Sequence, residues 1–328
     1  MPTPLPPLPL VVVALGGNAL LRRGEAPTAD HQAGAARQAA QQLAKVAGGV
    51  RLVVTHGNGP QVGLLALKEE AYDDGHPCPL DALDAESAGQ IGYVIELELA
   101  NAVAQETVAV ITRVLVDADD SAFGEPAKFI GPVYAEAAAR QLAADRGWAI
   151  KPDGDGWRRV VASPEPRAIV ELKPIRTLVD AGYLVVCVGG GGIPVVTQGP
   201  RQVGVEAVVD KGLSSALLAA ELGADLLVLA TDVTCVSTGW GSPHEQAITQ
   251  TTPGWLRART FAAGSMAPKV DAVCRFVEET GKRAAIGRLA DLTGLLEGTA
   301  GTQIASVPPW LPVSADDALA DLAQPSSR

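Results

Sequence analysis

The chain has 328 residues, 47% of them hydrophobic, and a formal net charge of −11 at pH 7. A chain of this length can bury a large core, and we expect it to divide into about two lobes. The negative charge argues against a nucleic acid partner, because such a protein needs a basic face to replace the counterions of the phosphate backbone.

The N-terminal part of the chain alternates predicted strands and helices. Residues 1–10 are rich in proline and predict a flexible leader. Apolar runs at 10–15 and 50–56 predict buried strands, and the Ala- and Gln-rich residues between them predict a helix over 29–47. Because strand, helix and strand follow one another, the two strands should be parallel with a right-handed crossover. The next expected elements are helices over 61–72 and 86–105 and a strand over 107–116.

The chain changes character between residues 117 and 167, where acidic residues, proline and glycine are frequent. This composition predicts a polar inserted subdomain. An Ala-rich stretch over 134–145 predicts one helix within it, and residues 157–162 predict a hairpin-like piece. Trp148 and Trp157 are interpreted as part of the subdomain core.

The C-terminal part continues the alternation. The apolar run 184–188 predicts a strand that leads into four glycines. The further expected elements are a strand over 203–209, a helix over 212–222, a strand over 226–230, a helix opened by 264–269 and ending near 279, and strands over 283–286 and 302–306. This pattern predicts an α/β fold throughout. Residues 308–328, with several prolines, predict a loose tail.

Three of the predicted strands end in glycine loops: Gly16-Gly17-Asn18, Gly57-Asn58-Gly59 and Gly189 to Gly192. Backbone amides without a neighbouring Cβ atom can close on an oxyanion, and the helix that follows adds the positive end of its dipole. A single loop of this kind is often only a connection. Three in one chain favour a shared anionic ligand.

Familiar signatures for other chemistries are missing. None of the three loops continues into Gly-Lys-Ser/Thr, so there is no Walker P-loop, and Gly57-Asn58-Gly59 meets its next glycine one residue late for a Rossmann fingerprint. The sequence contains no HExxH, GxSxG or CxxC. Phosphoryl transfer by backbone cradles and lysines remains.

The lysines support that interpretation. Only eight of the 26 basic residues are lysines, so arginine is the usual surface cation of this chain. Lys128, Lys211 and Lys269 stand at Pro- or Gly-rich junctions, the last two where a helix is expected to begin. A cation there opposes the helix dipole, and a bound anion would offset that cost. Taken singly, each could also be an ordinary solvated lysine.

Five motifs together resemble the bacterial carbamate kinases of the amino acid kinase superfamily. They are VVALGGNA (12–19), HGNGPQVG (56–63), GGGGIPV (189–195), GVEAVVDK (204–211) and GSMAPKV (264–270). The inserted segment fits as well, because the stretch around Lys128 and residues 156–161 resemble the protruding subdomain of that group.

The resemblance implies an open, mostly parallel sheet sandwiched by helices, with an N-terminal carbamate and carbamoyl phosphate lobe (11–210) that carries the subdomain as a lid and a C-terminal nucleotide lobe (211–307). It implies reversible transfer between ATP and carbamate, Mg²⁺ on the nucleotide phosphates, and a homodimer. The implied phosphoryl and substrate contacts are Gly16, Gly17, Asn18, Gly57, Asn58, Gly190, Gly191 and Gly192. The implied catalytic residues are Lys128, Lys211 and Asp210, the last orienting Lys211. The implied nucleotide contacts are Thr231, Asp232, Met266, Pro268 and Lys269.

The chain departs from the family at Thr234, where the usual run has an acidic residue. Two rival hypotheses stay open: another small-acid kinase on the same fold, and a non-catalytic nucleotide-binding regulator. His56 matches the family motif, and we interpret it as a loop histidine that caps backbone.

The four cysteines lack CxxC spacing, and two lie in apolar runs, which favours buried free thiols. The N-terminus lacks the features of a signal peptide, and no apolar run reaches about 18 residues. We therefore expect a cytoplasmic protein without a membrane partner.

Overall fold

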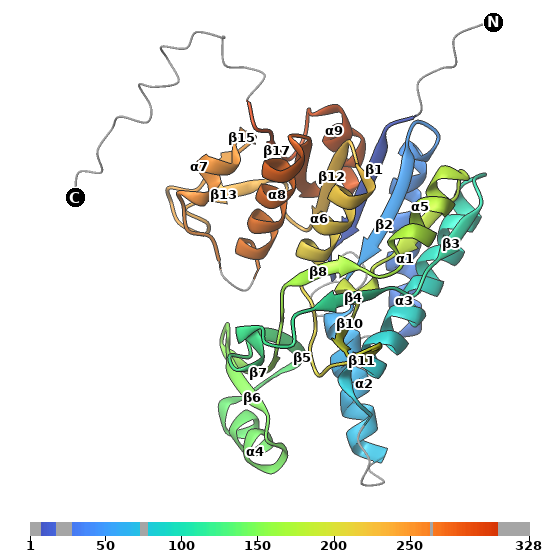
Figure 1. The fold of residues 1–328 in the computed structure, drawn as a ribbon. Coiled ribbons are helices and arrows are strands. Elements are labelled where there is room, and N and C mark those ends of the chain that lie inside the picture. Colours follow the sequence, from blue (N-terminus) through green and yellow to red (C-terminus); the bar gives the residue numbers. More distant parts are fainter. Residues whose placement is uncertain (1–7, 18–27, 73–77, 263–264, 308–328) are drawn as a thin grey trace, which may run out of the picture.

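The computed structural model describes residues 8–17, 28–72, 78–262 and 265–307. The predicted tail, Asn18 and most of the predicted leader lie outside these ranges. Within them the predicted α/β fold is confirmed, with a mostly parallel sheet covered by helices on both faces (Figure 1). None of the described helices is long and apolar enough to cross a membrane.

The central sheet has eight strands in the order β15-β17-β16-β12-β1-β2-β9-β3. Neighbouring strands pair in parallel, except that β16 and β17 are antiparallel. Parallel neighbours bring their C-terminal ends to one edge of the sheet, where the glycine loops follow. The strands are β1 (Leu10–Leu15), β2 (Arg51–His56), β3 (Thr107–Ala109), β9 (Leu184–Cys187), β12 (Leu226–Thr231), β15 (Gln250–Thr251), β16 (Arg283–Arg288) and β17 (Thr302–Ile304).

Helices on both faces explain why the central strands are continuous apolar runs. In β1, Val12 packs into the core on one face of the sheet and Val13 into the core on the other, because successive side chains point to opposite faces. The first core is completed by α5 (Leu172–Asp180), α6 (Lys211–Leu222) and α8 (Ala267–Thr280). The second is completed by α1 (Ala29–Ala47), α3 (Leu80–Ala102) and α9 (Leu292–Glu297).

The inserted residues form a small body of their own, drawn in green at the bottom of Figure 1. A three-stranded sheet in the order β5-β7-β6 carries one helix, α4, and the residues at its base belong to a four-stranded sheet in the order β11-β10-β4-β8. These elements are β4 (Arg113–Val116), β5 (Lys128–Tyr134), α4 (Glu136–Arg146), β6 (Ala149–Asp153), β7 (Gly156–Val161), β8 (Pro166–Ile169), β10 (Ile193–Gln198) and β11 (Arg201–Gly204). The predicted helix and hairpin of the insert are confirmed.

The remaining helices and strands begin at the end of the second glycine loop or lie in the C-terminal part of the chain. They are α2 (Gly59–Tyr72), β13 (Val236–Thr238), β14 (Gln246–Ile248) and α7 (Pro253–Arg257). The β13–β14 hairpin, α7 and α9 are not predicted from the sequence, because each is too short for a clear periodic pattern.

Three predicted boundaries were wrong. The single strand over 107–116 is two strands in different sheets, since Thr112 turns the chain between them: its hydroxyl donates to Val110 O at 2.8 Å and accepts from Val188 N at 3.0 Å. The strand predicted over 203–209 ends at Gly204, and only an isolated bridge follows at Ala207. Helix α3 begins at Leu80 rather than at 86, because Glu206 accepts a hydrogen bond from the Leu80 amide at 2.8 Å.

Candidate active site

The first glycine loop leaves β1 in close contact with β12. Gly16 N donates to Ala230 O at 3.1 Å, and a Cβ atom on Gly16 would lie 2.9 Å from the same oxygen. The next strand joins the same edge, because Gly57 N donates to Leu15 O at 3.3 Å. Glycine at position 16 is therefore needed for β1 and β12 to end side by side.

The second loop approaches both the first loop and Lys211. A Cβ atom on Gly57 would lie 3.7 Å from the amide nitrogen of Gly17 and 3.7 Å from Cδ of Lys211. Helix α2 starts at Gly59, so its amino end opens onto this place. The structure thus brings together two loops that are separated in the chain by α1 and β2.

The third loop follows β9 and requires unusual backbone angles. Val188 has φ of 51°, a strained value for a β-branched residue, and Gly190, Gly191 and Gly192 have φ of 73°, 102° and 86°. A Cβ atom would collide with the Asn58 amide at Gly190, with Val209 O at Gly191 and with Val114 at Gly192. The glycines allow this loop to pack against the second loop and against the start of α6.

Asp210 caps α6 and holds Lys128 of the insert. Its Oδ1 accepts from the amides of Gly212 at 2.8 Å and Leu213 at 3.2 Å, and its Oδ2 accepts from Lys128 Nζ at 2.5 Å. Burial alone would raise the pKa of Asp210, but the charge and hydrogen bond of Lys128, the hydrogen bond of the Leu213 amide and the charge of Lys211 together outweigh burial and lower the pKa to about 2. The carboxylate is therefore ionised at neutral pH and ties β5 to the rest of the molecule.

Lys211, the first residue of α6, points back toward the end of β1. Its Nζ donates to Leu15 O at 2.7 Å, and within the described ranges it forms no ion pair. Burial lowers its pKa to about 7, with repulsion from Lys269 and Lys128 adding to the effect and Asp210 opposing it. Asp210 acts on Lys211 through its charge, while its hydrogen bonds go to Lys128 and to the amides of Gly212 and Leu213. The result is a largely buried cation that forms no ion pair with any of the residues whose placement the structure describes.

The predicted nucleotide residues lie at the starts and ends of neighbouring elements. Pro268, the second residue of α8, lies close to the start of α6, since its carbonyl oxygen lies 3.8 Å from where a Cβ atom of Gly212 would be. Lys269 donates to Ser265 O at 2.7 Å and acts on Lys211 through its charge. Met266 stands just before α8 and packs against the core.

At the end of β12, the Thr231 hydroxyl donates to the carboxylate of Asp232 at 3.1 Å. Thr234 follows in the same turn with its side chain exposed. Its hydroxyl cannot supply the negative charge that the resemblance led us to expect there.

Two further polar residues at the site come from α3 and were not predicted. Asp84 Oδ1 accepts a hydrogen bond from Asn58 Nδ2, and the same nitrogen donates to Ser87 Oγ at 2.8 Å. Asp84 is fully buried, which raises its pKa to about 8, and its Oδ2 has no partner in the part of the chain that the structure describes. Asp84 lies before the predicted start of this helix at residue 86, and Ser87 lies inside the predicted helix, where no local motif marks it as part of a site.

His56 ends β2 and is buried, so it is not a loop residue. Burial lowers its pKa to about 4, and its Nδ1 lies 3.4 Å from Gly57 O. The imidazole is therefore neutral at pH 7 and adds no positive charge to the site.

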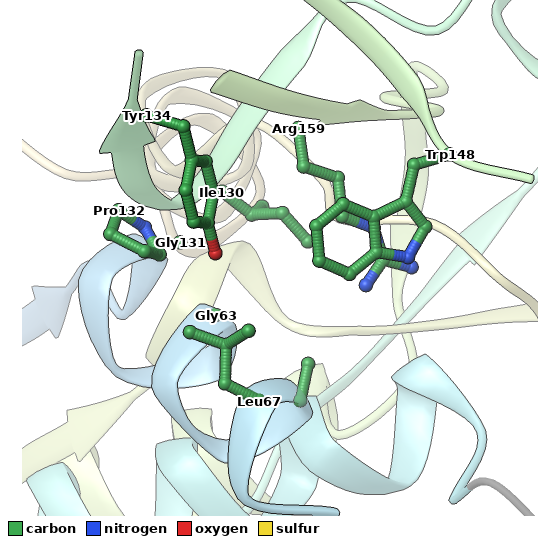
Figure 2. A pocket seen from close by; sticks show the side chains of 9 residues that line it. Gly63, Leu67, Ile130, Gly131, Pro132, Tyr134, Trp148 and Arg159 are labelled. Carbon is green, nitrogen blue, oxygen red and sulfur yellow. The ribbon is translucent and has the colours of Figure 1, made fainter. Parts of the chain in front are cut away.

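The insert is packed tightly against α2. A Cβ atom on Gly63 would collide with the backbone of Gly131 in β5. Figure 2 shows a small hollow beside this contact, with Tyr134, Trp148 and Arg159 above it and α2 below. The Arg159 guanidinium lies 4.7 Å from the centre of the Trp148 ring, consistent with the interpretation of Trp148 as part of the subdomain core.

Arg140 covers Trp157 in the same way, with its guanidinium 4.9 Å from the centre of the ring.

All four cysteines are free, as expected, and those in apolar strand and helix positions, Cys187 and Cys274, are buried. No cluster of three or more His, Cys, Asp or Glu side chains suited to a metal ion occurs among the residues with described placement.

Comparisons with known proteins agree with this geometry. The profile of the amino acid kinase family matches residues 9–288. The carbamate kinase of Rhizobium meliloti (strain 1021) is 52% identical over 301 residues, which cover 90% of this chain and 93% of that protein. The carbamate kinase of Haemophilus influenzae is 49% identical over 297 residues, which cover 90% of this chain and 96% of that protein.

Solved structures give the same result. The carbamate kinase of Giardia lamblia bound to citric acid has a TM-score of 0.85 and 38% sequence identity, with 90% of this chain and 98% of that chain covered. The same enzyme bound to AMP-PNP has a TM-score of 0.82 at the same identity and coverage. The chain belongs to the amino acid kinase family, in its carbamate kinase branch.

Proposed function

We propose that this site carries out the carbamate kinase reaction, in which a phosphoryl group passes reversibly between ATP and carbamate, giving ADP and carbamoyl phosphate. The observation that carries the proposal is Lys211. Its largely buried ammonium has no carboxylate partner in the described structure and lies where two of the glycine loops meet. A buried cation is costly unless it is paired, and the transferring phosphoryl group would supply that pair.

The three glycine loops would bind different parts of the reacting molecules. Gly16 and Gly17, with Asn18 beyond the described range, would hold the transferring phosphoryl group. Gly57, Asn58 and the loop Gly190 to Gly192 would hold carbamate or carbamoyl phosphate. Support for this division comes from the contact of Gly57 with Lys211 and of Gly190 with Asn58.

The chemistry needs placement and charge neutralisation more than covalent help. The phosphoryl transition state spreads negative charge over its oxygens, and the attacking and leaving oxygens must lie in line. Lys211 would neutralise that charge, and Lys128 would add a second cation from the insert. Carbamate is already an anionic nucleophile, so no general base is required, and His56 is not needed as one.

The nucleotide would bind beside the starts of α6 and α8. Pro268 and Lys269 stand at the amino end of α8, where the helix dipole favours phosphate. Mg²⁺ usually keeps several waters and binds one or two carboxylates together with substrate phosphates. The side chains of Thr231 and Asp232 fit that pattern and would hold it with the nucleotide phosphates, where the ion would neutralise part of their charge.

We assign residues 11–210 to a carbamate lobe, residues 211–307 to a nucleotide lobe and residues 117–167 to a lid. The ion pair between Lys128 and Asp210 joins the lid to the main body, and Asp210 immediately precedes Lys211. A lid of this kind would complete the site on closure and exclude water.

We also propose a cytoplasmic homodimer. Strand β3 is an edge of the central sheet, and beside it Tyr93, Leu97 and Ile111 expose 60%, 41% and 51% of their surfaces. Large apolar side chains grouped at an open sheet edge are typical of a protein–protein contact. Sedimentation equilibrium of wild type and of Tyr93→Glu would test this, with a monomeric wild type contradicting it.

The function itself is tested by coupled measurement of ATP formation from ADP and carbamoyl phosphate with Mg²⁺. We expect turnover whose rate falls by roughly 10²- to 10³-fold in Lys211→Met. Turnover of another acyl phosphate but not of carbamoyl phosphate would favour a different small-acid kinase. ADP binding without any turnover would favour a non-catalytic regulator.

A further inference from the structure

We propose that Asp84 and Ser87 orient the side chain of Asn58 so that its carbonyl oxygen faces the acceptor side of the site, and that this oxygen selects an acceptor with N–H donors beside its carboxyl group. The inference rests on the proposed phosphoryl transfer and deepens it. It assigns the choice of acceptor to particular atoms.

Asn58 lies within the candidate site. A Cβ atom on the preceding residue, Gly57, would lie 3.7 Å from Lys211 Cδ. On its other side the Asn58 amide packs against Gly190, where a Cβ atom would lie 2.9 Å from Asn58 Oδ1 and closer still to Nδ2. The amide is therefore enclosed by loops that also bracket Lys211.

Hydrogen bonding decides which end of the Asn58 amide is which. The Ser87 hydroxyl has one proton, which it donates to the main-chain carbonyl of Asp84 at 3.0 Å, so toward Asn58 its oxygen can only accept. The atom that faces Ser87 at 2.8 Å must then be the amide nitrogen. The same nitrogen donates to Asp84 Oδ1. Both N–H protons of Asn58 are thus committed to residues of α3.

The carbonyl oxygen of Asn58 remains for a ligand. It accepts no hydrogen bond from the residues that the structure describes, and it is not one of the buried polar atoms that are sealed from solvent without a partner. An amide oxygen can accept but not donate. It would therefore pair with the NH₂ group of carbamate or carbamoyl phosphate. Acetate and acetyl phosphate have a methyl group of similar shape in that position, and a methyl group cannot donate a hydrogen bond to this oxygen.

The surroundings keep this arrangement fixed. Asn58 is 2% exposed and Asp84 is fully buried, so rotation of the amide would leave buried groups without partners. Losing one such hydrogen bond, with its partner left buried, corresponds to roughly 5- to 150-fold in an equilibrium or rate constant. A site built to bond a particular donor rejects the analogue that lacks it for the same reason.

The test compares kcat/KM for carbamoyl phosphate with kcat/KM for acetyl phosphate, both with ADP, in wild type, Asp84→Asn and Ser87→Ala. In Asp84→Asn an amide faces Asn58 and can pair with either end of it. We expect the ratio of the two values to fall about 5- to 150-fold in this variant and less in Ser87→Ala, with acetyl phosphate turnover changed by less than about 3-fold. If acetyl phosphate turns over too slowly, its inhibition constant replaces kcat/KM.

Glu98→Gln serves as the matched control. Glu98 is a largely buried acid on the same helix that pairs with Arg37 at 3.1 Å, and it lies about 21 Å along α3 from Asp84. We expect its ratio to equal that of wild type. Thermal melts and ADP affinity identify the folded variants, and Ser87→Ala, which removes one hydroxyl, keeps the test available if Asp84→Asn does not fold.

A lower ratio in either folded variant supports the inference. An unchanged ratio in every folded variant, or an equal fall in the control, overturns it while leaving the proposed function in place. A wild type that turns over neither phosphate contradicts the proposed function instead.

Discussion

Removal of the Lys211 ammonium tests the proposed chemistry most directly. Lys211→Met keeps the length of the side chain and deletes its charge at a point 2.7 Å from Leu15 O and next to Gly57. Two anions that approach to 4 Å repel each other by about 4 kcal/mol at an effective dielectric constant of 20. A fixed cation between them offsets most of that repulsion, and does so most strongly in the transition state.

We therefore expect kcat of Lys211→Met to fall by roughly 10²- to 10³-fold, the scale found for one preorganised charge-stabilising donor. Lys211→Arg should not restore it, because a guanidinium is a wide planar fork and the Lys211 Cδ atom already lies within 3.7 Å of the Cβ position of Gly57. The assay is steady-state formation of ATP from ADP and carbamoyl phosphate, with ADP affinity and thermal melts as controls.

Asp210→Asn separates charge from structure at the neighbouring position. Asparagine is as good a helix cap as aspartate, so the bonds to the Gly212 and Leu213 amides can be kept while the charge opposite Lys128 is lost. A smaller fall in kcat than in Lys211→Met is expected. A kcat close to wild type in Lys211→Met would refute the reasoning.

Three further predictions follow from the same geometry. Lys128→Ala should lower carbamoyl phosphate turnover while leaving ADP affinity nearly intact, and an equal loss of ADP affinity by calorimetry would contradict its place on the carbamoyl side. Gly190→Ala should raise KM for carbamoyl phosphate by about 10-fold or more, because its Cβ atom would displace the Asn58 amide and its φ of 73° is strained for alanine; unchanged kinetics would contradict the contact. The pKa of Lys211 in the folded protein, about 7, lies below its ordinary value of 10.5. Burial of the charge therefore lowers the free energy of unfolding by its full amount below pH 7, and this loss of stability shrinks as pH rises from 7 toward 10.5. Ligand-free Lys211→Met should thus melt at a higher temperature than wild type near pH 7, with a difference that shrinks near about pH 9, and a difference independent of pH would contradict the shift.

Local sequence patterns determined the strands and their loops. β1, β2, β9 and β12 are short runs rich in apolar residues, many of them valine, and such runs are predictable because burial on both faces favours a continuous apolar pattern. The glycine loops were found for a related reason, since positive φ and close backbone approach demand glycine wherever they occur.

The errors arose where distant parts of the chain decide the outcome. Residues 107–116 have an uninterrupted strand pattern, yet Thr112 hydrogen-bonds to Val188 and the chain changes sheets there. The start of α3 at Leu80 depends on Glu206, which is 126 residues away in the chain. Neither contact leaves a trace in the local pattern.

In the candidate site, too, some features follow from local sequence and others depend on contacts between distant residues. The glycine pattern indicates which loops could hold an anion, and the resemblance to a family indicates which lysines would accompany them. The contacts of Lys211 with Leu15, of Asp210 with Lys128, and of Asp84 and Ser87 with the Asn58 amide are visible only in the folded molecule. Hydrogen bonds and burial depend on distances between residues far apart in the chain, and those distances exist only after the sheet and its helices have packed.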